Sequence, residues 1–249
     1  MKKYILTLIL ALASLGLYAQ TNRNKTIINA ALHGWEYEIK AGVNLGGTAP
    51  LPFPEEIRSI DGYNPTLSIT IEGNMTKWLD TKKKWGIITG LRLENKGMRT
   101  KATVKNYNME IIGYDGNRLK GNWTGGVRTK VQNSYITIPV LAAYKLSPRT
   151  TLKLGPYFSY LMDGDFSGHV YEGYLRETNP TGDKINFTNG AIATYDFSGD
   201  LRKFQWGVQA GVDWKAFKHL KVHADLNWGL NDIFNKDFKT VTFDMYAIY

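Results

Sequence analysis

The sequence has 249 residues and no cysteine. This absence excludes disulfide scaffolds, thiol nucleophiles, cysteine-ligated zinc or iron–sulfur centres and a lipid-modified N-terminal cysteine. Long apolar runs are scarce too, because the mean hydropathy is −0.31 and only the N-terminus carries an unbroken apolar stretch. A protein built from several membrane-spanning helices is therefore excluded. Acidic residues number 22 against 31 Lys and Arg, which leaves a formal net charge of +9.

The single apolar stretch predicts export. Lys2 and Lys3 precede the run from Ile5 to Leu17, and the small Ala19 follows it. A basic start, an apolar core of roughly 13 residues and a small residue at the cleavage point are typical of a secretory signal peptide. An uncleaved anchor is the alternative, but the core is too short to span a bilayer as a helix.

Beyond residue 35, apolar and polar side chains alternate with a period of two, which predicts β-strands. In residues 204–215 the even positions are apolar or aromatic, and the odd positions are polar or glycine. An even number of strands, each about ten residues long, suits strands that cross a bilayer at a tilt. The eight strands are expected at 35–45, 67–78, 85–94, 135–146, 152–160, 204–215, 221–230 and 241–249.

The lengths of the connections separate a membrane barrel from a soluble sandwich. Short connections at 79–84, 147–150 and 216–219 alternate with long ones at 46–63, 95–133, 163–200 and 231–239. Outer-membrane barrels have tight periplasmic turns and longer extracellular loops, whereas Greek-key sandwiches do not sort their loops in this way. The expected fold is all-β, an eight-stranded antiparallel up-and-down transmembrane β-barrel with long extracellular loops. We expect a signal peptide at 1–19, a short periplasmic segment at 20–34 and the barrel domain at 35–249.

Aromatic residues gather near the ends of the predicted strands. Tilted strands of a membrane barrel carry Trp and Tyr at the two interfaces, whereas a soluble protein buries them in the middle of core-facing runs. The predicted aromatic girdle comprises Trp35, Trp78, Trp85, Trp206, Trp214, Trp228 and Tyr249.

The opposite face of the predicted strands is polar and carries both signs of charge. An eight-stranded barrel is only wide enough for side chains to fill, so these charges are expected to pair across the lumen and leave no open pore. The central lumen network is predicted to be Lys153, Asp213, Lys215, Lys221, His223 and Asp225. The same alternation also turns Glu36, Glu38, Lys40, Glu72, Arg92 and Glu94 inward.

Three short stretches of the sequence resemble the PorT-like outer-membrane β-barrel family. They are the stretches 135–141 (YITIPVL), 153–158 (KLGPYF) and 228–233 (WGLNDI). The resemblance implies a small barrel of a Gram-negative outer membrane. It also implies a structural or partner-binding role in an outer-membrane assembly, because one family member is an accessory of type IX protein secretion. The final Tyr249 is similar to the terminal signal that barrel-assembly machinery recognises. The resemblance implies no catalytic residues.

Two other functional classes compete with this hypothesis. A small porin or transporter would conduct solutes. A lipid-A-modifying enzyme would use His223 and Asp225, two apart on one strand, with Asp213 on the next strand as a partner for general acid–base chemistry. No serine or second histidine stands in an evident partner position, so a structural polar cluster is favoured over catalysis. We therefore expect no enzyme activity, and the four histidines lack the paired spacing of a metal site. No cofactor is expected.

The long connection at 95–133 is basic. Exposed cations there are predicted to contact phosphates of lipopolysaccharide or an acidic partner, with a merely solvated surface as the alternative. Nucleic acid is not an expected partner of an exported barrel. The candidate anion- or partner-binding residues are Arg99, Lys101, Lys105, Arg118, Lys120 and Arg128, and Lys96 and Lys130 lie in the same connection.

Overall fold

A computed structural model describes residues 34–51, 53–113, 116–235 and 244–249. The predicted signal peptide and nearly all of the predicted periplasmic segment lie outside these residues. No helix in the described part of the chain is long and apolar enough to cross a membrane. The strands are β1 (Trp35–Asn44), β2 (Gly47–Leu51), β3 (Ile57–Pro65), β4 (Ser68–Trp78), β5 (Trp85–Ile112), β6 (Arg118–Lys145), β7 (Thr150–Glu177), β8 (Lys184–Asp196), β9 (Phe204–Lys215), β10 (Lys221–Gly229) and β11 (Asp244–Ile248), and a short 3-10 helix, η1 (Ser198–Asp200), follows β8.

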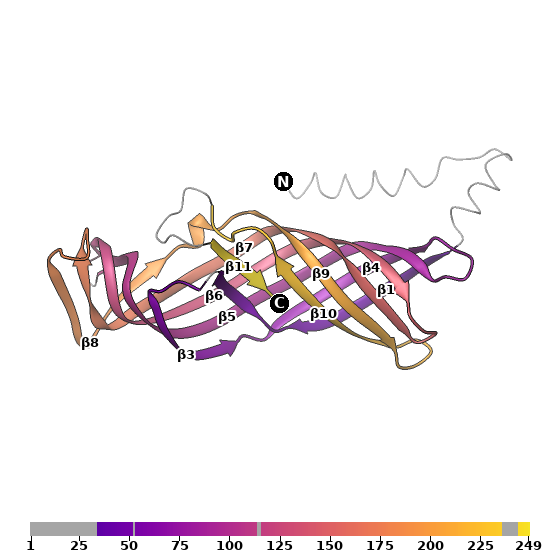
Figure 1. The fold of residues 1–249 in the computed structure, drawn as a ribbon, viewed down its shortest axis with the longest axis horizontal. Coiled ribbons are helices and arrows are strands. Elements are labelled where there is room, and N and C mark those ends of the chain that lie inside the picture. Colours follow the sequence, from indigo (N-terminus) through magenta and orange to yellow (C-terminus); the bar gives the residue numbers. More distant parts are fainter. Residues whose placement is uncertain (1–33, 52, 114–115, 236–243) are drawn as a thin grey trace.

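These strands form one antiparallel sheet that wraps around a long axis (Figure 1). The hydrogen-bonded order is β1-β4-β5-β6-β7-β9-β10-β11-β2, so the two ends of the order are consecutive pieces of the chain. β3 pairs with β5, and β8 pairs with β7 and with the far end of β5. We call the end with the short connections β4–β5, β6–β7 and β9–β10 the turn end, and the opposite end the hairpin end (Figure 1).

Each of the eight predicted strands overlaps an observed strand, although residues 241–243 of the last one lie outside the described residues. The described part of the sheet has eleven strand segments. Two of the additional segments, β3 and β8, lie in connections that the sequence predicts to be loops. The third is β2, which lies in the predicted connection at 46–63 and is separated from β1 by residues 45–46. The long loops at 95–133 and 163–200 are also largely strand, since β5, β6 and β7 each run for 28 residues.

Near the turn end, the sheet is polar inside and apolar outside. On β5, Arg92 and Glu94 point inward and are buried, whereas Leu91 and Leu93 point outward and are about half exposed. The same alternation fixes the orientation of β6, where Thr137 is buried inside. Such an arrangement is the reverse of a soluble domain and requires an apolar environment around the wall. Other exposed apolar side chains of this half include Ile39, Ile69, Ile71, Ile138, Val140, Leu152, Leu154, Val208, Val222 and Leu226.

Towards the hairpin end, the polarity of the two faces inverts along the same strands. On β5, the buried Lys96 is followed by the buried Met98 and Val104, while the outward positions become Arg99 and Lys101. An apolar core therefore fills this half, as in a soluble domain. It includes Met109, Ile111, Trp123, Val131, Phe166, Val170, Leu175, Phe187, Ala193 and Tyr195.

Candidate functional site: a filled lumen and a cationic outer wall

The first cluster inside the sheet is centred on Lys153 of β7. Its ammonium lies 2.6 Å from Asp213 Oδ1 of β9 and 2.8 Å from Asp225 Oδ1 of β10. Lys40 of β1 approaches the same Asp213 oxygen at 3.5 Å. The Lys153 side chain is fully buried. Four strands thus contribute to one group of paired charges across the lumen.

A second cluster lies next to the first, centred on Arg92 of β5. Its guanidinium bonds to Glu72 of β4, lies 3.7 Å from a Glu94 oxygen and donates to Gln209 Oε1 of β9 at 2.7 Å. Thr137 Oγ1 of β6 donates to Glu94 Oε1 at 2.7 Å. These contacts link β5 to its neighbours β4 and β6 and, across the lumen, to β9. They satisfy charges that are costly to bury alone.

Lys96 closes the second cluster and overturns two predictions. Lys96 is buried inside and lies 3.2 Å from Glu94, so it does not belong to the outward cationic region. Its ammonium lies 5.2, 5.4 and 5.1 Å from the ring centres of Tyr135, Tyr157 and Tyr249. Tyr249 is therefore part of the lumen and not of a lipid-facing girdle, because Ala247 and Tyr249 take the inward phase of β11. The arrangement is a cation held among three aromatic faces.

The remaining predicted lumen residues lie near the turn end. His223 is directly opposite Asp213 in the β9–β10 ladder, and Lys221 is opposite Lys215. Lys221 Nζ donates to Glu38 Oε2 at 2.6 Å, whereas Lys215 is exposed at the rim. The structure thus brings Lys153, Asp213 and Asp225 together and leaves Lys215 outside that group. No group of three potential metal ligands occurs among the described residues.

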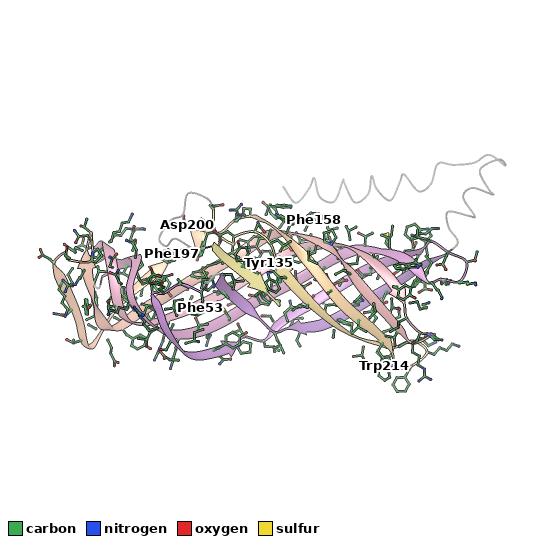
Figure 2. The ribbon with its side chains drawn as sticks, in the orientation of Figure 1. Phe53, Tyr135, Phe158, Phe197, Asp200 and Trp214 are labelled. Carbon is green, nitrogen blue, oxygen red and sulfur yellow. The ribbon has the colours of Figure 1, made fainter. Side chains whose placement is uncertain are left out.

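The predicted girdle is partly on the outer face. Trp85, Trp206, Trp214 and Trp228 are exposed there, and Trp35 is half-buried beneath Lys77, whose ammonium lies 5.2 Å from its ring. Figure 2 shows Phe158 and Trp214 outside the wall and Tyr135 within it. Trp78 is an exception like Tyr249, because only 7% of it is exposed. It forms a small buried apolar cluster with Ile88, Leu141 and Ala143 on β4, β5 and β6.

β1 and β10 face each other across a cleft at the turn end. In the described part of the chain, β1 pairs only with β4, and residues 221–226 of β10 pair only with β9. The cleft has a volume of about 1170 Å³; both strands line it together with Glu72, Arg92 and Tyr249, so it reaches inward to the charged side chains of the lumen. The ion pair between Lys221 and Glu38 spans it, and a Cβ built on Gly42 would lie 3.3 Å from His223 Nε2. Two strand edges therefore lie side by side, and no strand of the described residues lies between them.

The predicted anion-binding residues fall into two groups. Arg99 and Lys101 of β5 lie directly opposite Lys130 and Arg128 of β6, and all four point outward. Arg118 and Lys120 lie at the far hairpin end, where Arg118 pairs with Glu110 at 2.8 Å. Lys105 is exposed beside a β5 irregularity, away from the first group. The structure thus gathers Arg99, Lys101, Arg128 and Lys130, which we call the cationic block.

Acidic and neutral groups surround the cationic block. Lys130 Nζ donates to Asp165 Oδ2 at 2.6 Å. Burial opposes ionisation of Asp165, but hydrogen bonds from Lys130 and Ser167 outweigh it and lower the pKa of this carboxyl. Burial and the nearby Arg128 charge lower the pKa of His169, which lies opposite Arg128 on β7. The block therefore holds four permanent cations and one acidic partner in direct contact.

These observations agree with a comparison to known families. A family model for an outer-membrane protein β-barrel domain matches residues 18–235. The chain belongs to this outer-membrane β-barrel family. Membership places the protein in the outer membrane and accounts for the apolar outer face near the turn end. No curated protein matches the chain.

The central lumen prediction omitted several residues that complete the two clusters. Gln209 and Thr137 have uncharged side chains and gave no signal of charge pairing, although their strand phase turns them inward. Lys96 was assigned to a loop because the alternation of β5 changes polarity next to it. Strand phase carried through 28 residues would have placed Lys96 in the lumen.

Proposed function

We propose that the protein is a plugged, eight-stranded, up-and-down barrel that acts by binding partners in an outer-membrane assembly. β1 and β2 count as one interrupted strand in this proposal, because β1 pairs with β4 and β2 pairs with β11. The ring is then completed by β5, β6, β7, β9 and β10. Export by the predicted signal peptide and a role in type IX protein secretion rest on the PorT-like resemblance.

The two charge clusters inside the lumen are the observation that carries this proposal. Lys153, Arg92 and Lys96 lie there with their counter-ions, and the contacts of Lys153 and Arg92 join strands across the lumen. This argues against a porin, whose lumen holds a water-filled channel. The purified protein in planar lipid bilayers is expected to give no stepwise conductance. Stable single-channel currents would refute the plugged barrel.

The cleft between β1 and β10 supports partner binding. Exposed apolar side chains on both strands, Ile39 and Val222, place their edges within the membrane. Unpaired backbone groups in hydrocarbon cost several kcal/mol each, so such edges need a strand between them. An extended segment of a partner, antiparallel to both strands, would supply the missing hydrogen bonds by strand addition.

Crosslinking tests this partner strand directly. Because the chain has no cysteine, Ile39→Cys or Val222→Cys places a single thiol at each edge. Leu154→Cys is the matched control, since Leu154 is equally lipid-facing but lies on β7 between two paired strands. In native outer membranes, one partner peptide should crosslink from both edge positions and not from the control. Crosslinks only within the chain, or none, would refute the partner strand.

Isolation of the intact protein from native outer membranes in mild detergent tests the assembly itself. Reproducible, stoichiometric partners are expected. A covalent link between the Lys221 and Glu38 side chains across the cleft should abolish their co-purification. A lone barrel would refute the assembly role.

We expect no enzyme activity, because His223 faces Asp213 near the turn end without a nucleophile in contact. His223→Ala should leave lipid A unaltered in a folded protein, and a change in lipid A that depends on His223 would refute this.

A further inference from the structure

The position of the membrane surface can be read from the polarity inversion. Asn95 of β5 lies opposite Ser134 of β6, which lies opposite Asp163 of β7, and Ser134 donates to Asn95 Oδ1 at 3.0 Å. The outward apolar side chains named on β5, β6 and β7, from Leu91 and Leu93 to Leu152 and Leu154, all lie on the turn-end side of this row. Because hydrocarbon ends where outward side chains become polar, the row marks the outer boundary of the apolar layer.

The cationic block lies a short way beyond that row. Arg99 is four residues from Asn95, and Lys130 is four residues from Ser134. Four residues span about 13 Å along a strand, which a tilt of roughly 40° reduces to about 10 Å above the boundary. Headgroups occupy about 5–8 Å on each side of a bilayer, and Lys and Arg extend their charges towards them on long stems.

The arrangement within the block is unfavourable without an anion. Arg99 faces Lys130 and Lys101 faces Arg128 across one ladder, and like charges directly opposite each other destabilise a sheet. Of these four cations, only Lys130 forms an ion pair within the described part of the chain, with Asp165. The guanidinium carbon of Arg128 lies 4.9 Å from the Tyr171 ring, which holds that side chain against the wall.

A groove on the hairpin half receives this block. It has a volume of about 940 Å³ and is lined by all four cations together with His169. Two carboxylates, Asp61 and Asp196, also line it. Asp61 accepts hydrogen bonds from the hydroxyls of Ser59 at 2.6 Å and Thr103 at 2.7 Å, and Asp196 accepts one from Ser198 at 2.6 Å. Hydroxyl donors leave both carboxylates ionised, and neither forms an ion pair with the block. Four cations against these two carboxylates and Asp165 still leave the groove with an excess of positive charge.

We propose that the cationic block binds the phosphate groups of a glycolipid in the outer leaflet. Phosphate accepts charge-assisted hydrogen bonds from Arg and Lys, and it relieves the repulsion of the two facing pairs. The acyl chains of the same lipid lie against the apolar wall below, where Leu91, Leu93 and Ile138 are exposed. One molecule therefore meets both surfaces. The proposal needs the outer-membrane placement and is independent of the partner strand at β1 and β10.

Lipid binding by the intact protein in nanodiscs tests the proposal. The probes are bisphosphorylated lipid A, lipid A without phosphates and inorganic phosphate, with bound molecules counted by native mass spectrometry. The test variant is R99Q/K101Q/R128Q/K130Q. The matched control is K82Q/K84Q/R149Q/K218Q, which removes the same charge from exposed positions of the three turns at the turn end.

Bisphosphorylated lipid A should bind the unaltered protein at least about tenfold more tightly than the dephosphorylated form, and high salt should weaken it. The test variant should bind bisphosphorylated lipid A at least about tenfold more weakly than the unaltered protein does. The affinity of the control variant should stay within about twofold of the unaltered protein. Equal binding of the two lipids, equal loss in the control or displacement of the lipid by equimolar inorganic phosphate would overturn the proposal. The comparison of the two lipids on the unaltered protein decides the matter even if the test variant does not fold.

Discussion

Lys153 is the side chain whose loss should most clearly reveal the lumen network. Its ammonium is shared between Asp213 at 2.6 Å and Asp225 at 2.8 Å, and it has no exposed surface. In Lys153→Met, the apolar stem keeps its volume but two buried carboxylates lose their common cation. Lys40, at 3.5 Å from Asp213, then becomes the nearest cation to that carboxylate among the described residues. Removing one partner of a buried ion pair costs about 3–5 kcal/mol, so we expect a loss of that size in the free energy of unfolding.

Reversible urea unfolding in lipid vesicles, followed by tryptophan fluorescence, measures this loss. The control Lys218→Met removes an exposed charge from the β9–β10 turn and should stay within about 0.5 kcal/mol. The triple variant Lys153→Met/Asp213→Asn/Asp225→Asn should recover at least half of the loss, because it leaves neither carboxylate buried without its cation, and Lys40 keeps Glu38 at 4.0 Å. A single variant that costs less than about 1 kcal/mol, or a triple variant no more stable than the single one, would refute the argument.

Three further predictions test other parts of the molecule. Trp123→Ala should cost about 3–5 kcal/mol and make the hairpin half sensitive to protease while the turn half stays resistant, since Trp123 is fully buried against Phe187. Gly211→Leu should destabilise the barrel by about 1–3 kcal/mol, because a Cβ there meets a carboxylate of the lumen cluster; a neutral effect in urea unfolding would contradict this. Although burial opposes its ionisation, the bond from Lys130 lowers the pKa of Asp165. The pair therefore stabilises the fold above the ordinary carboxyl pKa, and this contribution is lost as pH falls through the folded value. Lys130→Gln should raise the Asp165 pKa, as measured by carboxyl NMR, and an unchanged pKa would contradict the pairing.

The sequence predicts the turn half of the fold well. There, one face of each strand meets lipid and the other meets paired charges, so the two faces differ strongly and alternation is clear. The phase in β9 places Gln209 and Asp213 inside and Trp206 and Trp214 outside, as the structure shows. Mixed charge on the inward face also predicts that the lumen contains both signs, although it does not predict which residues pair.

The hairpin half is harder to predict for the same physical reason. Beyond the membrane boundary, the outward face becomes polar and the inward face apolar, so a strand that continues appears to lose its period. The sequence prediction therefore ends β5 at Glu94 and treats Met98 to Val104 as a loop. Trp78 and Tyr249 show a related difficulty, because an aromatic side chain near a strand end suits a girdle or a closed lumen equally well.

Under the two proposals, the polarity inversion gives the two halves different partners. The turn half is stabilised by lipid outside and by Lys153 and Arg92 with their counter-ions inside, so its remaining demand is for backbone pairing at the β1 and β10 edges. The hairpin half supplies its own apolar core, so its outer wall is free to carry charge. The four cations stand on that wall close to the boundary, where the nearest abundant anions are headgroups. Farther from the boundary, Arg118 is instead paired with Glu110 within the chain.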